Sequence, residues 1–263
     1  MSLLLETEQL TIRFGGLTAV NEVDFHIDEG ETIGLIGPNG SGKTTFFNLL
    51  SGIYKPIRGQ IRYYGENLVG LPPFKIAMKG IARTFQNSRL FLNLSIIDNV
   101  LIGMHPHQGS TWFDDVFRRR YVQRELRKSV GKGLELLSHF SQGLAENCYK
   151  RVADLPQADR RKLEICRALA SSPKLLLLDE PSAGMSPEET QELMEDIRKV
   201  RKRMQGIGII IIEHDMMVIR EIAQRVAVLN YGRKIAEGSF QEVSNKDEVL
   251  EAYLGREENS AAA

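Results

Sequence analysis

The strongest chemical signal in the sequence is a glycine-rich segment, Gly37-Pro38-Asn39-Gly40-Ser41-Gly42-Lys43-Thr44-Thr45. It matches the pattern G-x-x-x-x-G-K-[ST], and it follows an apolar run and precedes a segment with helical character. The glycines allow main-chain N–H groups to turn inward around a phosphate, and a helix N-terminus adds its positive dipole end. Lys43 would neutralise charge on the β- and γ-phosphates, and Thr44 would offer its hydroxyl to Mg²⁺. These nine residues predict a nucleoside triphosphate site.

Two adjacent carboxylates, Asp179 and Glu180, follow the apolar run at residues 175–178. In a parallel sheet, ligands collect at the carboxyl ends of the strands, where both side chains are expected. Asp179 would hold Mg²⁺ directly or through water, and Glu180 would polarise an attacking water molecule. His214 follows a third apolar run, residues 207–212, so we expect it at the same edge, within reach of a γ-phosphate. A histidine alone is more often structural, so its assignment depends on the other two motifs.

These residues need strands that end at a common edge, and the sequence predicts such strands. Residues 23–28 alternate apolar and polar side chains up to Gly30, which is typical of a half-buried strand, and residues 60–64 form a similar segment. Other runs are apolar almost without interruption, which favours parallel strands covered by helices on both faces: residues 32–36, 175–178 and 207–212.

Helix starts are marked by capping motifs. Ser186-Pro187-Glu188-Glu189 combines an N-cap serine, a proline at the first helical position and a glutamate at the third. Ser95 and Ser239 begin similar motifs. Residues from about 90 to 170 predict successive helices with no strand, so we expect a helical insertion in an α/β core that resumes at Lys174.

Composition excludes several classes of protein. Thirty-four basic and 34 acidic residues among 263 disfavour a globally basic nucleic-acid binder, and 42% hydrophobic residues are typical of a globular chain.

Cys148 and Cys166 lack metal-ligand spacing, so we expect free thiols in helices. Basic runs at residues 118–128 and 198–203 are interpreted as solvated helix faces, with anionic lipid headgroups as a minor alternative for the first. No apolar stretch approaches the ~20 residues of a membrane helix. We expect a cytosolic chain.

The order of these motifs resembles the ATP-binding subunit of an ABC transporter, and the resemblance covers residues 3–255. It implies that Phe14 stacks on adenine and that Gln86 links the γ-phosphate and Mg²⁺ to the membrane partner. Lys43, Glu180, His214 and Gln86 would then be the catalytic set. The nucleotide would be bound by Phe14, residues 37–45, Gln86 and Asp179. Mg²⁺ would be held by Thr44, Gln86 and Asp179.

Finer motifs are similar to the ATPase subunits of branched-chain amino acid importers. They are Phe14-Gly15-Gly16-Leu17, Arg83-Thr84-Phe85-Gln86, Arg89-Leu90-Phe91, Pro181-Ser182-Ala183-Gly184-Met185 and Ala252-Tyr253-Leu254-Gly255. The resemblance implies uptake through separate permease subunits, which would dock near residues 86–99. It also implies a second ATPase subunit in a head-to-tail dimer, met by residues 182–186, and a peripheral location on the inner face of the plasma membrane. Importers of urea or amides and lipopolysaccharide-type exporters are the alternatives within the family.

One segment departs from the family pattern. The family signature is Leu-Ser-Gly-Gly-Gln, whose serine and glycine amides close on the γ-phosphate held by the other subunit. The aligned residues here are Leu155-Pro156-Gln157-Ala158-Asp159. Pro156 offers neither a hydroxyl nor an N–H, and the next two residues carry Cβ atoms where close backbone approach is expected. We expect Asp159 to act as the N-cap of the following helix. This departure affects how the chain would close over the nucleotide that is bound by its partner subunit. It favours a partner ATPase subunit that is not a second copy of this chain.

The expected architecture is an α/β nucleotide-binding domain over residues 1–255. Its core, with an antiparallel β subdomain near the N-terminus, comprises residues 1–87 and 171–240. A helical subdomain is inserted at residues 88–170, a helical segment follows at 241–255, and residues 256–263 form a flexible tail.

Two other classes of protein are disfavoured by the sequence. Asn245-Lys246-Asp247-Glu248 resembles a guanine-reading Asn-Lys-x-Asp motif of regulatory GTPases, but its fourth residue is Glu and it lies beyond the core strands. Soluble ABC-type ATPases of DNA repair or ribosomes carry coiled-coil insertions or two cassettes, for which 263 residues leave no room.

Overall fold

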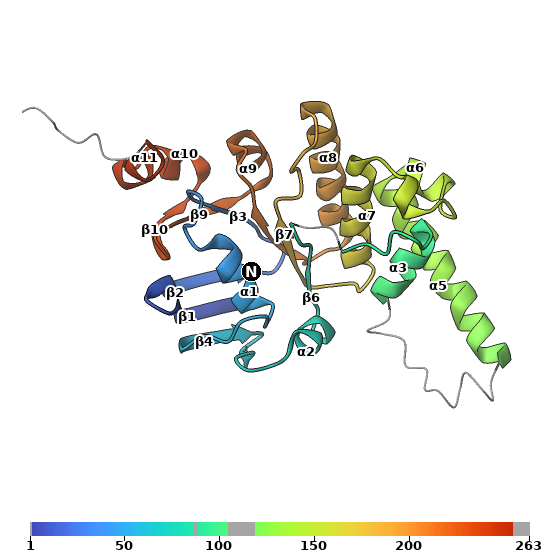
Figure 1. The fold of residues 1–263 in the computed structure, drawn as a ribbon, viewed down its shortest axis with the longest axis horizontal. Helices are drawn as coiled ribbons and strands as arrows, with labels where there is room; N and C mark the ends of the chain where they lie inside the picture. The colour runs from blue at the N-terminus through green and yellow to red at the C-terminus, as the bar shows by residue number, and fades with distance from the viewer. Residues whose placement is uncertain (1, 87–88, 105–118, 255–263) are drawn as a thin grey trace, which may run out of the picture. The chain divides into compact units, whose positions relative to one another are not determined.

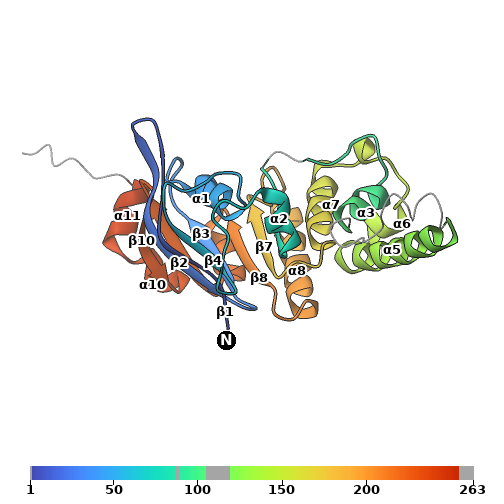
Figure 2. The ribbon, with the colours of Figure 1, turned by 90° about the horizontal axis from the view of Figure 1, so that it is seen from below.

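The computed structural model describes residues 2–86, 89–104 and 119–254, and the chain divides into two compact units. Unit 1 contains residues 1–76 and 208–263, and unit 2 contains residues 77–207. The ribbon is drawn from two directions in Figure 1 and Figure 2. Strands and helices are mixed in both units, which confirms the expected α/β class. Within the residues described, no helix has the combination of length and apolar character that crossing a membrane requires.

Unit 1 contains an antiparallel sheet with the strand order β2-β1-β4-β5. Its strands are β1 (Leu3–Phe14), β2 (Leu17–Asp28), β4 (Arg58–Tyr63) and β5 (Glu66–Asn67). On β2, Val23, Phe25 and Ile27 are buried whereas Asp24 and His26 are exposed, as the alternating pattern predicts. This sheet is the antiparallel β part expected near the N-terminus.

The remaining strands of unit 1 are mainly parallel. Strand β3 (Thr32–Ile36) pairs in parallel with β8 (Gly208–Ile212) and with β9 (Arg225–Asn230), and β10 (Arg233–Gly238) is antiparallel to β9. All five residues of β3 and all five of β8 are buried, because these apolar strands form the core. Among the described residues, this unit contains the helices α1 (Lys43–Leu50), α9 (Met216–Ile222), α10 (Phe240–Ser244) and α11 (Asp247–Leu254), and α2 (Pro73–Met78) begins in it.

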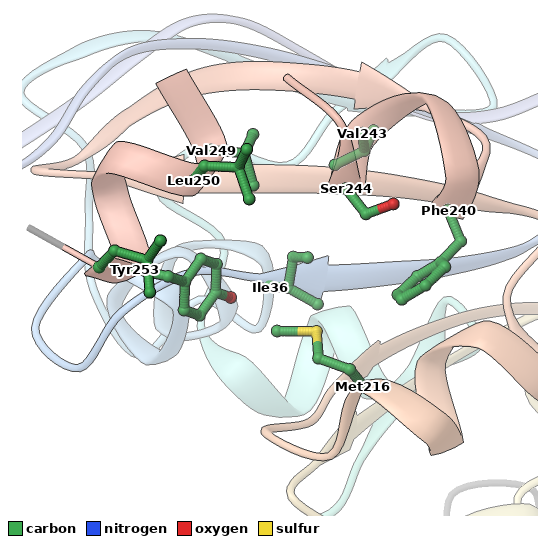
Figure 3. A pocket seen from close by; sticks show the side chains of 9 residues that line it. Ile36, Met216, Phe240, Val243, Ser244, Val249, Leu250 and Tyr253 are labelled. Carbon is green, nitrogen blue, oxygen red and sulfur yellow. The ribbon is translucent and has the colours of Figure 1, made fainter. Parts of the chain in front are cut away.

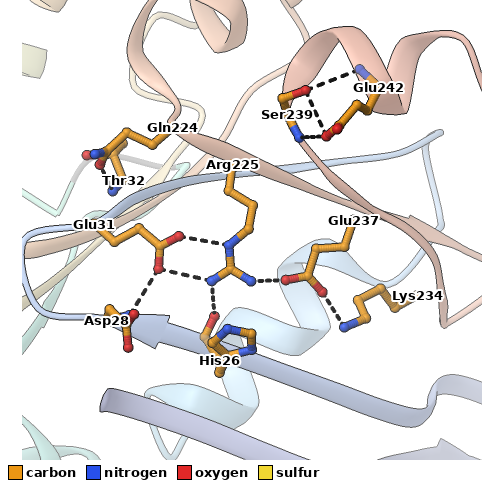
Figure 4. Close-up of polar contacts among 10 residues, drawn as sticks. All are labelled: His26, Asp28, Glu31, Thr32, Gln224, Arg225, Lys234, Glu237, Ser239 and Glu242. Atoms are coloured by element: carbon orange, nitrogen blue, oxygen red, sulfur yellow. Dashed lines mark hydrogen bonds and ion pairs between the residues drawn. The ribbon is translucent and has the colours of Figure 1, made fainter. Parts of the chain in front are cut away.

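A cluster of charged side chains fastens the start of β9 to the segment that leads into β3 (Figure 4). The Arg225 guanidinium donates to both carboxylate oxygens of Glu31, at 2.7 and 2.9 Å, and to the main-chain oxygen of His26 at 2.8 Å. It also pairs with Glu237, which in turn pairs with Lys234. Burial raises the pKa of Glu31, but hydrogen bonds from Arg225 and from the Asp28 main chain outweigh it, so the pKa lies below its ordinary value.

Unit 2 has two parallel strands, β6 (Ile81–Arg83) and β7 (Leu175–Asp179), with Arg83 paired to Leu177. Its helices, as far as the described residues show them, are α3 (Ile96–Met104), α5 (Arg119–Phe140), α6 (Gln142–Glu146), α7 (Gln157–Leu169) and α8 (Pro187–Arg203), with a 3₁₀ turn at Val152–Asp154. Helix α3 packs against α5 and α7. The capping box at Ser186 is present at the start of α8, and a second one at Ser239 begins α10.

Two local expectations are wrong. Helix α7 begins at Gln157 with Pro156 as its N-cap, so Asp159 lies in the first turn and does not cap the helix. The proline fixes an extended backbone at residue 156, and the helix can start directly after it.

The second wrong expectation is the helical placement of Cys148, which lies in a turn after α6, whereas Cys166 is helical as expected. Both are buried free thiols, as expected. The predicted tail, residues 256–263, and part of the first basic run lie outside the described residues.

Candidate nucleotide site

The phosphate-binding loop connects β3 to α1 in unit 1, and its glycines are sterically required. Gly37, Gly40 and Gly42 have φ values of 146°, 77° and 104°, in the region that other residues rarely adopt. A Cβ atom on Gly42 would lie 2.3 Å from the Ala19 main-chain oxygen, and one on Gly37 would lie 2.0 Å from the oxygen of Leu229. Only glycine therefore fits at residues 37 and 42.

The interior of the loop is built for an anion. The Lys43 ammonium is buried and donates to the main-chain oxygens of Gly37 at 2.7 Å and Pro38 at 2.9 Å. The Ser41 hydroxyl is buried, and it has no hydrogen-bond partner within the part of the chain that the structure describes. A phosphate oxygen would satisfy that hydroxyl and the lysine together, because both can donate. The loop therefore fits the triphosphate that its sequence predicts.

His214 and Phe14 also belong to unit 1. Strand β8 ends two residues before His214, and its Ile212 pairs with Leu35 of β3, so the loop and the exposed His214 follow the same carboxyl edge. Phe14 ends β1 and its ring is 44% exposed, with its edge against Tyr54 at 5.1 Å between ring centres. An exposed aromatic face is available for a base to stack on.

An apolar pocket lies between the end of β3, the start of α9 and the two C-terminal helices (Figure 3). Its volume is about 250 Å³, and it is lined by Ile36, Met216 and side chains of α10 and α11. Ile36 directly precedes the loop, and Met216 is the second residue after His214. Burial raises the pKa of Tyr253 in α11, and a main-chain hydrogen bond from Gly37 partly offsets this. The C-terminal helices thus contact the base of the loop.

The two predicted carboxylates lie in unit 2 at the end of β7. Asp179 is 2% exposed, and its carboxylate accepts from the Arg83 guanidinium at 2.8 Å. Glu180 has a φ of 49°, a strained value for a residue with a Cβ, of the kind that is concentrated at functional sites. Its carboxylate accepts from the Gln86 side-chain amide at 2.8 Å. The structure thus brings the side chains of Gln86 and Glu180 together. Asp179 directly precedes Glu180 in the chain.

Sequence reasoning missed the residues that hold the main chain at Gln86 in place. Arg161 of α7 donates to the main-chain oxygens of Phe85 at 3.2 Å and Gln86 at 2.7 Å. Glu164, which is 2% exposed, accepts from the Phe85 N–H at 3.4 Å and pairs with Arg161 at 3.3 Å. The signal available in the sequence was a glutamate on the apolar face of a helix. These contacts attach α7 to the segment that contains Gln86.

The structure assigns the predicted site residues to both units. Phe14, residues 37–45 and His214 belong to unit 1, whereas Gln86, Asp179 and Glu180 belong to unit 2. Their roles in nucleotide chemistry stay predictions.

Comparison with known proteins gives the class of protein that this fold and loop define. Residues 20–183 match the ABC transporter family, so the chain belongs to that family and is an ABC-type ATPase with an ATP-binding cassette. Residues 233–259 match a second family, described as the branched-chain amino acid ATP-binding cassette transporter. The expected resemblance is confirmed.

The particular relatives are transport ATP-binding proteins. The high-affinity branched-chain amino acid transport ATP-binding protein BraF of Pseudomonas aeruginosa is 39% identical over 254 residues, which cover 96% of this chain and 98% of BraF. LivG of Escherichia coli K12, with the same description, is 39% identical over 252 residues, with 96% and 98% coverage. The lipopolysaccharide export protein LptB of Haemophilus influenzae is 30% identical over 254 residues, with 97% and 98% coverage.

A solved structure supports the same fold. The ADP conformation of MJ1267, an ATP-binding cassette of an ABC transporter, has a TM-score of 0.83 at 27% identity, and the alignment covers 97% of this chain and 100% of that one.

Proposed function

We propose that this chain hydrolyses ATP to power the uptake of branched-chain amino acids through separate permease subunits. The observation that carries the proposal is 39% identity over 96% of the chain to BraF, a branched-chain amino acid transport protein. The match of residues 233–259 to the C-terminal segment named for the same transporters supports the same substrate class. LptB is less similar, at 30% identity, and the C-terminal match favours amino acids over its lipopolysaccharide substrate.

In this proposal the loop and Phe14 bind the nucleotide. The main-chain N–H groups of residues 37–45 and the Lys43 ammonium hold the phosphates, because a buried cation in an N–H-lined loop compensates their charge. The exposed ring of Phe14 stacks on adenine. Tyr54 packs against that ring in a T-shaped arrangement, with 5.1 Å between the ring centres.

Mg²⁺ would be held by the Thr44 hydroxyl, the Gln86 amide oxygen and the Asp179 carboxylate. These oxygen ligands are those that Mg²⁺ prefers, and when bound the ion would neutralise phosphate charge. Glu180 acts as the general base that orients and deprotonates water. Its contact with the Gln86 amide fixes the orientation of the carboxylate. His214 donates to the γ-phosphate from the end of β8.

The partners follow from two surfaces. Phe91, Leu92 and Leu94 are exposed apolar residues within the 86–99 segment, and we assign this segment to a cytoplasmic helix of the permease. Docking there would hold the chain peripherally on the inner face of the plasma membrane. A second ATPase subunit would complete a nucleotide sandwich. Since Pro156 removes a donor from the signature, that subunit is a different chain with an ordinary signature.

Transport in proteoliposomes tests the proposal. The chain would be purified with the permeases and second ATPase subunit encoded beside its gene, and reconstituted with ATP enclosed on the side of the ATPase subunits. Radiolabelled leucine, isoleucine or valine, supplied with the cognate binding protein, should accumulate. Lys43→Ala should abolish accumulation without preventing assembly. ATPase stimulation by another solute, with no uptake of these three, would overturn the substrate assignment.

A further inference from the structure

Arg83 and Asp179 form a buried ion pair at the ends of two neighbouring strands. Arg83 ends β6 and Asp179 ends β7, and the two strands pair in parallel. The Arg83 Nη2 atom lies 2.8 Å from Asp179 Oδ2, and the two side chains are only 5% and 2% exposed. At this burial the pair is largely shielded from water, so each charge depends strongly on the other.

Neighbouring contacts hold both partners in this geometry. The Thr84 hydroxyl accepts from the Asp179 main-chain N–H at 3.2 Å, and the Thr84 N–H donates to the Leu177 oxygen at 2.9 Å. The Arg83 guanidinium also lies over the Phe85 ring, 5.0 Å from its centre. The end of β6 thus fixes the main chain of Asp179 through Thr84 and its carboxylate through Arg83.

We propose that Arg83 is a resident counter-cation of Asp179, which holds the carboxylate in the metal-free chain and competes with Mg²⁺ for it. The inference rests on the proposed role of Asp179 as a ligand of Mg²⁺. A buried carboxylate needs a positive partner, and here the chain supplies one before any metal arrives. Whatever part of this pairing is lost when the metal binds Asp179 is subtracted from the affinity for the metal, by linkage. Arg83 therefore positions Asp179 and also weakens the binding of Mg²⁺.

Arg83→Met tests the proposal, because methionine keeps much of the side-chain length and removes the charge. The affinity for a fluorescent ATP analogue would be measured in EDTA and in excess Mg²⁺, and the ratio of the two gives the gain in affinity from the metal. A hydrogen bond to a charged group is worth about 10- to 100-fold in an equilibrium constant, so the gain should be at least about tenfold larger in Arg83→Met than in the wild type. The metal-free protein should melt at a lower temperature, and Mg-ATP should raise its Tm by more than in the wild type.

Arg62→Met is the matched control. Arg62 pairs with Glu8 at 2.7 Å on the antiparallel sheet of unit 1, where both side chains are accessible to solvent. The same substitution there should leave the gain in affinity unchanged. Arg83→Lys keeps a positive charge but offers a point charge in place of the planar guanidinium, so its gain should rise in the same direction by about two- to threefold. It provides the test if Arg83→Met does not fold.

The outcomes separate three cases. An unchanged or smaller gain in Arg83→Met and Arg83→Lys, with equal losses of Tm in EDTA and in Mg-ATP, would show a structural ion pair only and would overturn the proposal. Asp179→Asn should remove the gain from Mg²⁺ altogether. If Asp179→Asn kept a wild-type gain, the proposed metal role of Asp179 would fail, which is a different result from failure at Arg83.

Discussion

Restoring the family signature should turn this chain into an effective ATPase on its own. The variant P156S/Q157G/A158G/D159Q places Ser-Gly-Gly-Gln after Leu155, at the start of α7. In a homodimer of the natural chain, both nucleotides would be closed by a segment in which Pro156 has no N–H and no hydroxyl. The variant supplies the missing donors and removes two Cβ atoms and a carboxylate from the expected position of the γ-phosphate.

The expected gain can be set against the cost to folding. One donor to a developing negative charge is worth about 2.7–4 kcal/mol, or about 10²–10³ in turnover. Two glycines in the first turn of α7 cost up to about 1 kcal/mol each, and a serine N-cap returns about 1 kcal/mol. The net cost of about 1 kcal/mol is small beside a typical stability of 5–15 kcal/mol, so the variant should fold.

Steady-state phosphate release by the purified chain at saturating Mg-ATP is the assay, and the rate should rise at least about 100-fold. Adding Glu180→Gln to the variant should abolish the gain and should trap an ATP-dependent dimer that size-exclusion chromatography detects. A variant that folds and dimerises with ATP, but hydrolyses no faster than the natural chain, would refute the reasoning.

Four further substitutions have expected outcomes. Lys43→Ala and Thr44→Ala should each lower Mg-ATP affinity at least tenfold, measured by calorimetry, because the phosphates lose their buried cation or the metal its hydroxyl; near-natural affinity in both would contradict the site. Arg89→Glu should reduce co-purification with the permease, whereas normal assembly would count against docking there. Glu31→Gln should lose about 1.5–3 kcal/mol at pH 7 in urea unfolding, since Arg225 loses a charged acceptor. The pKa of Glu31 is depressed, so this difference should shrink as pH falls below 4.5, and a constant difference would exclude the ion pair as its cause.

Elements with strong local patterns were predictable from the sequence. Strand β3 was expected at residues 32–36 and occupies Thr32–Ile36, because an uninterrupted apolar run between polar segments has few other stable placements. The capping boxes at Ser186 and Ser239 were likewise predictable, since their hydrogen bonds join residues three positions apart. The phosphate loop is local in the same sense, because its glycines and Lys43 act within nine residues.

Contacts between distant segments were not predictable. The Arg83–Asp179 pair joins residues 96 positions apart, and β6 is only three residues long, too short for a periodic pattern. The bond from Arg161 to the Gln86 main chain spans 75 positions. Such contacts depend on which strands and helices lie next to one another in the fold. The identity of a single residue does not indicate which elements are neighbours. The wrong N-cap at α7 has a local cause, because the capping preference of Asp159 lost to the backbone fixed by Pro156.

In the proposed function, this chain hydrolyses ATP on its own phosphate loop and thereby drives transport. Leucine uptake and ATPase activity should be measured in proteoliposomes containing the full transporter, with Glu180→Gln in this chain compared against the matching substitution in the second ATPase subunit. Glu180→Gln in this chain should abolish uptake, whereas the substitution in the partner should leave much of it, because the partner's nucleotide site is closed by the altered signature of this chain, residues 155–159. Equal losses from the two substitutions would contradict the asymmetry, and undiminished uptake with Glu180→Gln would contradict the claim itself.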